Sequence, residues 1–149
     1  MEIVVAAVGR MKSGPTRELW DDYAKRITWP LSLREVEEKR PLSGAELKAR
    51  EGELLRKAVP DKAYLVCLDA TGKSLDSRTF ARKLNEWQEN GPVAFMIGGA
   101  DGLDGTLLTQ ASFALSLGAM TWPHMLARTM LIEQIYRAQC ILTNHPYHR

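Results

Sequence analysis

Four short apolar runs, each followed by a glycine or an aspartate, constrain the fold of this chain most strongly. They are Ile3–Val8, Ala63–Leu68, Val93–Ile97 and Phe113–Leu117. A continuous apolar run of this length, rich in β-branched residues, indicates a strand that is buried on both faces. Strands of this kind belong to parallel sheets that are covered by helices.

The segments between these runs carry helical signals. Apolar residues at helical spacing, with start and stop residues at the ends, predict helices over 13–27, 43–58, 76–90, 103–110 and 123–142. Ser43 and Glu46 form a capping box at the start of the second helix. A fifth strand, Leu31–Glu38, alternates and is expected near an edge of the sheet. Strands alternating with helices predict one α/β domain over residues 1–149, a mostly parallel sheet with helices on both faces.

Composition and missing motifs exclude several classes of protein. A net charge of +2 is too balanced to indicate a nucleic-acid partner by itself. Gly72-Lys73-Ser74 lacks the upstream glycine of a phosphate-binding loop, because Cys67 stands at that position. The dinucleotide fingerprint G-x-G-x-x-G and the serine-hydrolase elbow G-x-S-x-G are both absent from the chain.

The cysteines and the apolar stretches bear on the cellular compartment. Cys67 and Cys140 each lie in an apolar run far apart in the sequence, which favours two buried free thiols. The first residues carry Glu2 where a signal peptide would be positive. No apolar stretch approaches the ~20 residues of a membrane span. We therefore expect a cytoplasmic protein with no membrane partner.

Glycines follow three of the four buried strands. Gly9, Gly98 and Gly118 stand at these ends, and Leu68 ends the fourth. Ligands of parallel sheets bind beyond the carboxyl ends of the strands, and glycine there allows a close approach to the backbone. The alternative is that these glycines only make turns.

Two further segments carry chemistry. The loop 117–122 is apolar and uncharged, so we expect a partner subunit or a flat apolar ligand such as an adenine ring to cover it. The tail 144–149 gathers two histidines, a tyrosine and an arginine, which suit RNA stacking, phosphate pairing and proton transfer. A solvated tail is the alternative. A metal site at His145 and His148 rests on spacing alone, and we expect no metal.

Three segments together resemble one family, and a fourth supports them. They are Ile97–Leu103, Leu115–His124 and Asn144–Arg149, with Ile132–Ala138 in support. The chain resembles the SPOUT, or trefoil-knotted, methyltransferases, and among them the bacterial enzymes that methylate N3 of a pseudouridine in a large-subunit ribosomal RNA stem-loop. The resemblance covers nearly the whole chain. Trp122 departs from it, because relatives often have leucine or phenylalanine there.

The resemblance implies a fold, a cofactor and partners. It implies a C-terminal trefoil knot, a homodimer with sites shared between subunits, and 23S ribosomal RNA, on the assembled 70S ribosome, as substrate. S-adenosyl-L-methionine is the implied cofactor, and the matching pocket residues are Leu68, Gly98, Leu117, Gly118, Ala119, Met120, Thr121 and Trp122. A tRNA-modifying relative and a non-catalytic RNA-binding module are the alternatives.

The resemblance also assigns the chemistry to the tail. His148, Tyr147, His145 and Arg149 are the implied catalytic residues, and Arg128 and Glu133 are expected beside the substrate. Within this set either histidine is a candidate general base and Tyr147 would orient the nucleobase. Arg149 or Arg128 would stabilise developing negative charge.

Overall fold

Five parallel strands form one sheet in the structure, a computed structural model that describes residues 1–149. The strands are β1 (Ile3–Val8), β2 (Leu31–Val36), β3 (Tyr64–Ser74), β4 (Val93–Ile97) and β5 (Phe113–Ser116). The helices are α1 (Pro15–Arg26), α2 (Gly44–Ala58), α3 (Ser77–Trp87), α4 (Gly105–Gln110) and α5 (His124–Leu142), with a short 3-10 turn at Gln88–Asn90. The predicted order of strands and helices is confirmed.

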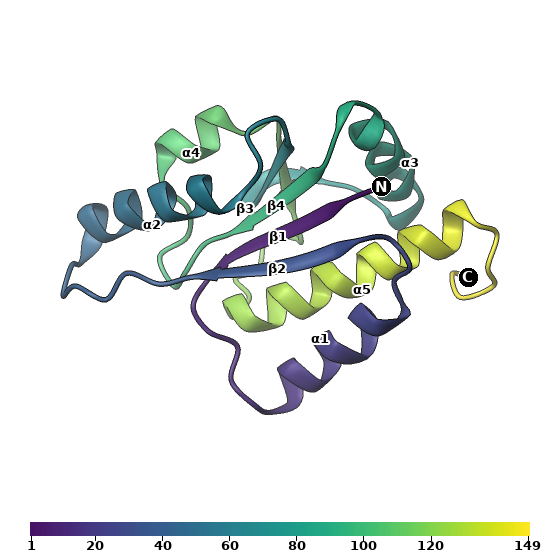
Figure 1. Ribbon diagram of the computed structural model, residues 1–149, viewed down its shortest axis with the longest axis horizontal. Coiled ribbons are helices and arrows are strands. Elements are labelled where there is room, and N and C mark those ends of the chain that lie inside the picture. The colour runs from purple at the N-terminus through teal and green to yellow at the C-terminus, as the bar shows by residue number, and fades with distance from the viewer.

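The strand order is β2-β1-β4-β3-β5, and every neighbouring pair is parallel. All residues of β1 and β4 are buried, as their continuous apolar runs predict. The first strand therefore lies inside the sheet, and β2 lies at an edge as expected (Figure 1). In a parallel sheet the carboxyl ends of all strands point to the same side of the sheet, and ligands bind there.

Helices cover both faces of the sheet, which confirms the predicted α/β architecture (Figure 1). One core cluster joins β1, β4 and β3 to α1, α3 and α5 through side chains such as Trp20, Phe80 and Ile135. The smaller cluster on the other face joins the sheet to α2 and α4 through Leu55 and Leu107. Helix α5 packs against both α1 and α3, so it is the centre of the larger layer.

The ends of several elements differ from the sequence prediction. Strand β3 was expected to end at Leu68, but it continues after an irregularity, and Lys73 again pairs with Leu115. The extension is possible because Gly72 has no side chain: a Cβ there would lie 2.5 Å from the Ala114 carbonyl oxygen. Asp76 then caps α3, accepting a bond from the Thr79 N–H at 2.7 Å.

The predicted capping box at the start of α2 does not form. Ser43 is the N-cap residue, but its side chain makes no capping hydrogen bond. The two cysteines are free and buried, as predicted, and burial raises the pKa of the Cys67 thiol to about 12. The trefoil knot that the resemblance implies stays a prediction.

Candidate active site

Leu68, Gly98 and Leu117 lie in or directly after three neighbouring strands, and Leu68 is the last residue of β3 before its irregularity. Strand β3 stands between β4 and β5, and its register pairs Cys67 with Met96 and Leu68 with Leu115. Gly98 and Leu117 follow β4 and β5 directly. The sheet therefore brings these three predicted cofactor positions to one edge, although 49 positions separate Leu68 from Leu117 in the sequence.

Gly98 begins a tight turn in which the backbone folds against itself. Gly98 is buried, and a Cβ on it would lie 2.6 Å from the carbonyl carbon and oxygen of Gly102. An isolated β-bridge between Gly99 and Gly102 closes the turn. The packing of the turn itself therefore requires glycine at position 98. This agrees with the alternative that the glycines after the strands serve to make turns.

The loop after β5 is fixed at its base and open at its tip. Ser116 Oγ accepts from the Gly118 N–H at 3.0 Å, and Gly118 has a φ of +115°. Met120 and Trp122 are 75% and 42% exposed, which is unusual for large apolar side chains. The main-chain N–H groups of 119–122 make no hydrogen bond within the chain. The loop therefore presents apolar side chains and free polar backbone, a combination that suits a flat apolar ligand with a polar edge.

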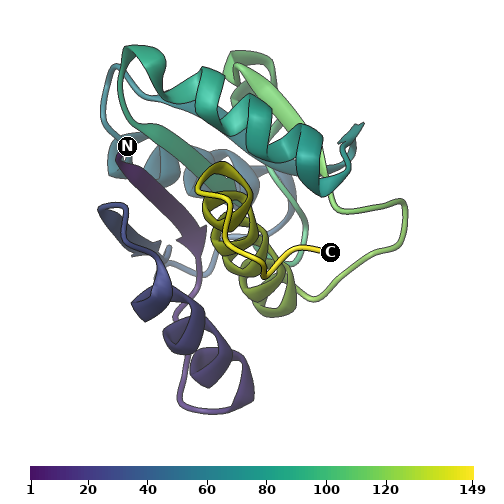
Figure 2. The ribbon, with the colours of Figure 1, turned by 90° about the vertical axis from the view of Figure 1, so that its right-hand side faces the viewer.

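A cleft of about 940 Å³ lies between α1, the start of α3, the end of β5 and α5. Leu117 and Gly118 line it on the side of the loop, and His148 lines it on the side of the tail. Asp76, Arg78 and Glu133 supply its charged groups. Figure 2 faces this end of the molecule, with α3 above α5 and the C-terminal tail in front of α5. Within one chain, this cleft is where the two predicted sets of residues meet.

Tyr147 anchors the tail to the helices. Its hydroxyl donates to Glu133 Oε1 at 2.9 Å and lies 3.3 Å from the Tyr23 hydroxyl. Its ring meets the edge of Tyr136, with centroids 4.8 Å apart. Burial first, and then these hydrogen bonds, raise the pKa of the Tyr147 phenol. The tyrosine is therefore a neutral hydrogen-bond donor at neutral pH.

Arg137 was missed by the sequence analysis and holds the tail from the other side. It donates to Glu133 Oε1 from Nε at 3.0 Å and from Nη2 at 2.7 Å. Its guanidinium carbon lies 4.8 Å from the centre of the Tyr147 ring, and its Nη1 lies 3.1 Å from His148 Nδ1. The spacing of Glu133 and Arg137, four residues apart in a predicted helix, was the available signal.

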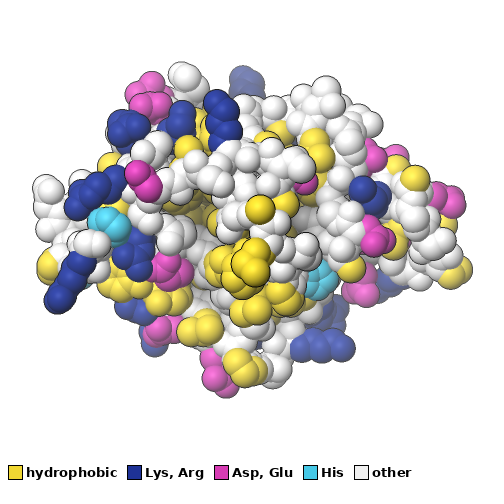
Figure 3. Space-filling model, turned by 180° about the vertical axis from the view of Figure 1, so that it is seen from behind, with side chains coloured by type: hydrophobic (Ala, Val, Ile, Leu, Met, Phe, Trp, Pro, Cys, Tyr) yellow, Lys and Arg dark blue, Asp and Glu magenta, His cyan; other side chains and the backbone are white.

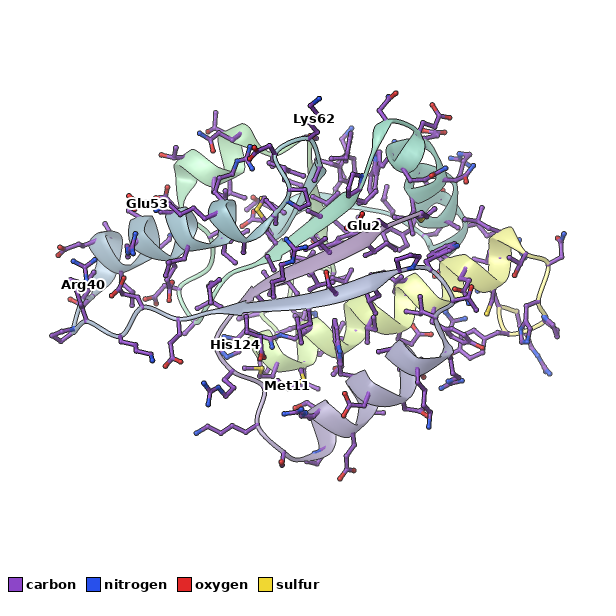
Figure 4. The ribbon with its side chains drawn as sticks, viewed as in Figure 1. Glu2, Met11, Arg40, Glu53, Lys62 and His124 are labelled. Carbon is purple, nitrogen blue, oxygen red and sulfur yellow. The ribbon has the colours of Figure 1, made fainter.

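The other two tail residues are more exposed. The Tyr147 N–H donates to His145 Nδ1 at 3.2 Å, and the imidazole of His145 is otherwise exposed. Arg149 is exposed and makes no hydrogen bond or ion pair within the chain. His124 lies at the first turn of α5, at the other end of that helix from the tail (Figure 4).

Arg128 is fully buried and faces the sheet. Its Nη1 donates to Glu35 Oε2 at 2.6 Å, and its Nη2 donates to the carbonyls of Val8 and Gly9 at 3.2 and 3.1 Å. Burial lowers the pKa of the guanidinium, and the Glu35 carboxylate opposes that shift. A contact between Arg128 and a substrate would require breaking these bonds, so the geometry favours a structural role. Glu35, its partner, was not predicted.

Comparison with known proteins assigns the family. Residues 1–148 match the family model described as predicted SPOUT methyltransferase. The chain is a SPOUT methyltransferase. The family model covers nearly the whole chain, whereas the assignment of individual site residues stays a prediction. No helix of this SPOUT methyltransferase is both long and apolar enough to cross a membrane.

Individual relatives agree with the family. "Ribosomal RNA large subunit methyltransferase H" of Rhodospirillum centenum is 52% identical to this SPOUT methyltransferase, covering 100% of the chain and 99% of the relative. A solved structure of a probable methylase family protein from Haemophilus influenzae Rd KW20 superimposes with a TM-score of 0.63 at 15% identity, over 99% of this chain and 70% of that one. The putative methyltransferase Lpg2936 from Legionella pneumophila, solved with bound SAM, has a TM-score of 0.50 at 13% identity, over 93% of this chain and 66% of that one.

Proposed function

We propose that this chain methylates N3 of a pseudouridine in a stem-loop of 23S ribosomal RNA, with S-adenosylmethionine as the methyl donor. One observation carries the proposal: a ribosomal RNA methyltransferase shares 52% of its residues with this chain over the full length of both. A family model spanning residues 1–148 supports the reaction class. The substrate nucleoside comes from the resemblance of the loop 115–124 and the tail 144–149.

The residues at the carboxyl edge fit S-adenosylmethionine. The loop 117–122 leaves its backbone N–H groups free and exposes Met120 and Trp122, which suits an adenine ring and its polar edge. Leu68 and Gly98 would border the same ligand from β3 and β4. When bound, S-adenosylmethionine supplies a methyl group that its sulfonium has already activated. The protein therefore needs to orient the base and manage one proton.

The tail supplies the groups for that task. N3 of the base carries a proton that must leave, and His148 or His145 is the candidate acceptor. The hydroxyl of Tyr147 is held by Glu133 and Tyr23, and we propose that Tyr147 orients the nucleobase from this position. Arg149 is free to meet RNA phosphate or developing negative charge. The buried position of Arg128 makes it a residue that positions the end of β1.

We propose that the active protein is a homodimer. Four large apolar side chains stay exposed in one chain, namely Leu19 in α1, Met120 and Trp122 in the loop, and Leu126 in α5. Figure 3 shows hydrophobic side chains gathered near the centre of one face, with basic side chains around its rim. Leu19 and Leu126 also border the cleft. A second copy that covers these four side chains would bury them and bring its tail to the site.

The assembled ribosome in the cytoplasm is the proposed setting. The chain has a net charge of only +2 and consists of one sheet with its covering helices. Little electrostatic attraction is available for free RNA, so shape presented by the ribosome would select the loop. Full-rate methylation of protein-free 23S RNA would contradict this part of the proposal.

Methyl transfer from labelled S-adenosylmethionine to 70S ribosomes tests the function. Ribosomes from cells lacking this modification are the substrate, and digestion with mass spectrometry identifies the nucleoside. Label on N3 of a large-subunit pseudouridine supports the proposal. Label on tRNA alone would favour the tRNA-modifying alternative. Cofactor binding without methyl transfer to either RNA would overturn the proposed substrate. Absence of both cofactor binding and methyl transfer would favour a non-catalytic RNA-binding module.

A further inference from the structure

We propose that Arg137 is a positioning residue that fixes His148 as a hydrogen-bond donor to the substrate. The inference rests on the proposed function and revises one part of it, because His148, a candidate base there, becomes a hydrogen-bond donor. His148 lines the cleft together with Leu117 and Gly118. The role of its imidazole therefore depends on which of the two ring nitrogens carries the proton.

The contact with Arg137 decides that question. Arg137 Nη1 lies 3.1 Å from His148 Nδ1. A guanidinium group has only N–H donors and stays charged in proteins, so Nδ1 must offer its lone pair. A neutral imidazole that accepts at Nδ1 carries its proton at Nε2. In this position His148 has no free acceptor, and Nε2–H is its remaining polar group.

The guanidinium is held in place by its other bonds. Two of its nitrogens donate to the same oxygen of Glu133, and the Tyr147 ring lies beneath its plane at 4.8 Å. The Arg137 and Glu133 side chains are 25% and 19% exposed, so solvent competes little for this pair. Glu133 also accepts from the Tyr147 hydroxyl. One carboxylate thus orders both the arginine and the tail.

His145, the second histidine of the tail, has the same tautomer. The Tyr147 N–H donates to His145 Nδ1 at 3.2 Å, which again leaves the proton on Nε2. With the tail docked in this way, neither imidazole is available to remove a proton. The N3 proton would then pass to water or to a carboxylate of the cleft such as Asp76, rather than to a histidine.

A donor has a clear use in this reaction. When N3 loses its proton, the negative charge spreads onto the two carbonyl oxygens that flank N3, and an N–H donor stabilises it there. The N3 electron pair then forms the bond to the methyl carbon, and the carbon–sulfur bond breaks with its pair on sulfur. His148 would lower the barrier by binding a carbonyl oxygen, and Arg137 would keep it in the required tautomer.

Nitrogen NMR tests the tautomer without reference to activity. In protein labelled with ¹⁵N-histidine, long-range proton–nitrogen spectra distinguish a protonated ring nitrogen from an unprotonated one, and a spectrum of His148→Gln identifies the signals. We expect His148 with Nδ1 unprotonated and Nε2 protonated. A proton on Nδ1 would overturn the proposal. This result stands even if ribosomes prove not to be the substrate.

Activity of two matched variants tests the role. The side-chain amide of His148→Gln places an N–H group near the position of Nε2, whereas His148→Leu has no donor. Loss of one transition-state donor costs about 100- to 1000-fold in kcat, so we expect that loss in His148→Leu and a loss of at most about tenfold in His148→Gln. Equal losses in both variants would overturn the proposal.

Arg137→Leu tests the positioning step. We expect kcat to fall while KM for S-adenosylmethionine stays unchanged, and Arg137→Lys to recover little because it cannot bond Glu133 and His148 together. Arg26→Leu is the control, since Arg26 also stacks on tyrosines, Tyr23 and Tyr136, but makes no bond to the tail. Equal kcat values for the Arg137 and Arg26 variants would contradict the proposal.

Discussion

Arg128 Nη1 lies 2.6 Å from Glu35 Oε2, and the arginine side chain is completely buried. The same carboxylate oxygen accepts from the Met11 N–H at 2.7 Å. The other end of the guanidinium holds the carbonyls of Val8 and Gly9. This pair therefore joins α5, the edge strand β2 and the carboxyl end of β1.

Removing the arginine should destabilise the fold. In Arg128→Leu the Glu35 carboxylate and two main-chain carbonyls lose their donor inside the protein. We expect the free energy of unfolding to fall by roughly 3–5 kcal/mol, measured by urea denaturation. Lys25→Leu is the control, because the exposed Lys25–Asp22 pair contributes little, and a change within about 0.5 kcal/mol is expected. Similar small losses in both variants would refute the structural role.

Two glycines should respond differently to alanine. A Cβ on Gly98 would lie 2.6 Å from backbone atoms of Gly102, and backbone cannot move aside cheaply. We expect Gly98→Ala to lower the free energy of unfolding by roughly 1–3 kcal/mol and to weaken S-adenosylmethionine binding in calorimetry. At Gly105, in the first turn of α4, a Cβ meets nothing within 4 Å, so Gly105→Ala should be neutral or stabilising. Equal behaviour of the two variants would contradict the close packing of the turn.

The Glu38 carboxylate should make stability depend on pH in the acid range. Hydrogen bonds from the Arg40 side chain and backbone, and then from Arg50, lower the pKa of Glu38 from 4.5 to about 2. The folded value is below the unfolded value, so this stabilisation is present above pH 4.5 and is lost as pH falls toward 2. The Tm difference between wild type and Glu38→Gln should therefore shrink over this window. A constant difference would show that the carboxylate charge contributes nothing.

The exposed apolar side chains should carry the dimer. Leu126 is 39% exposed in the single chain, so Leu126→Asp should leave the fold intact, as judged by circular dichroism. We expect the Kd of the dimer to rise at least about tenfold in sedimentation experiments, because a charge would be buried at the interface. Gln110→Asp, on α4 at the opposite face of the sheet, is the control. A wild-type protein that sediments as a monomer would contradict the homodimer.

Local patterns in the sequence were sufficient for most of the fold. The apolar runs Ile3–Val8 and Val93–Ile97 became fully buried parallel strands, because a strand with no polar face has to be covered on both sides. Helix α1 begins at Pro15 and helix α3 begins after its N-cap residue Asp76, also for local reasons. The location of Leu68 and Gly98 on the same side of the sheet could also be anticipated, since the carboxyl ends of parallel strands all lie on one side of the sheet.

Other features depended on contacts between residues far apart in the chain. The continuation of β3 past Leu68 depends on the fit of Gly72 against Ala114, which no pattern within β3 reveals. Arg128 and Arg137 look alike in the sequence, because both are arginines within the same predicted helix. Nothing in the local pattern therefore indicates that one is buried and the other lies near the surface.

In the tertiary structure, Arg128 and Arg137 differ in how deeply they are buried and in which residues they bond. Arg128 meets Glu35, 93 positions away, and becomes part of the core, whereas Arg137 stays at the surface and meets His148. The sequence by itself determined the strands, the helices and the family, because those follow from local periodicity and motif identity. The roles of the two arginines followed only from the fold, because the free energy of a charge depends on the groups that surround it in space.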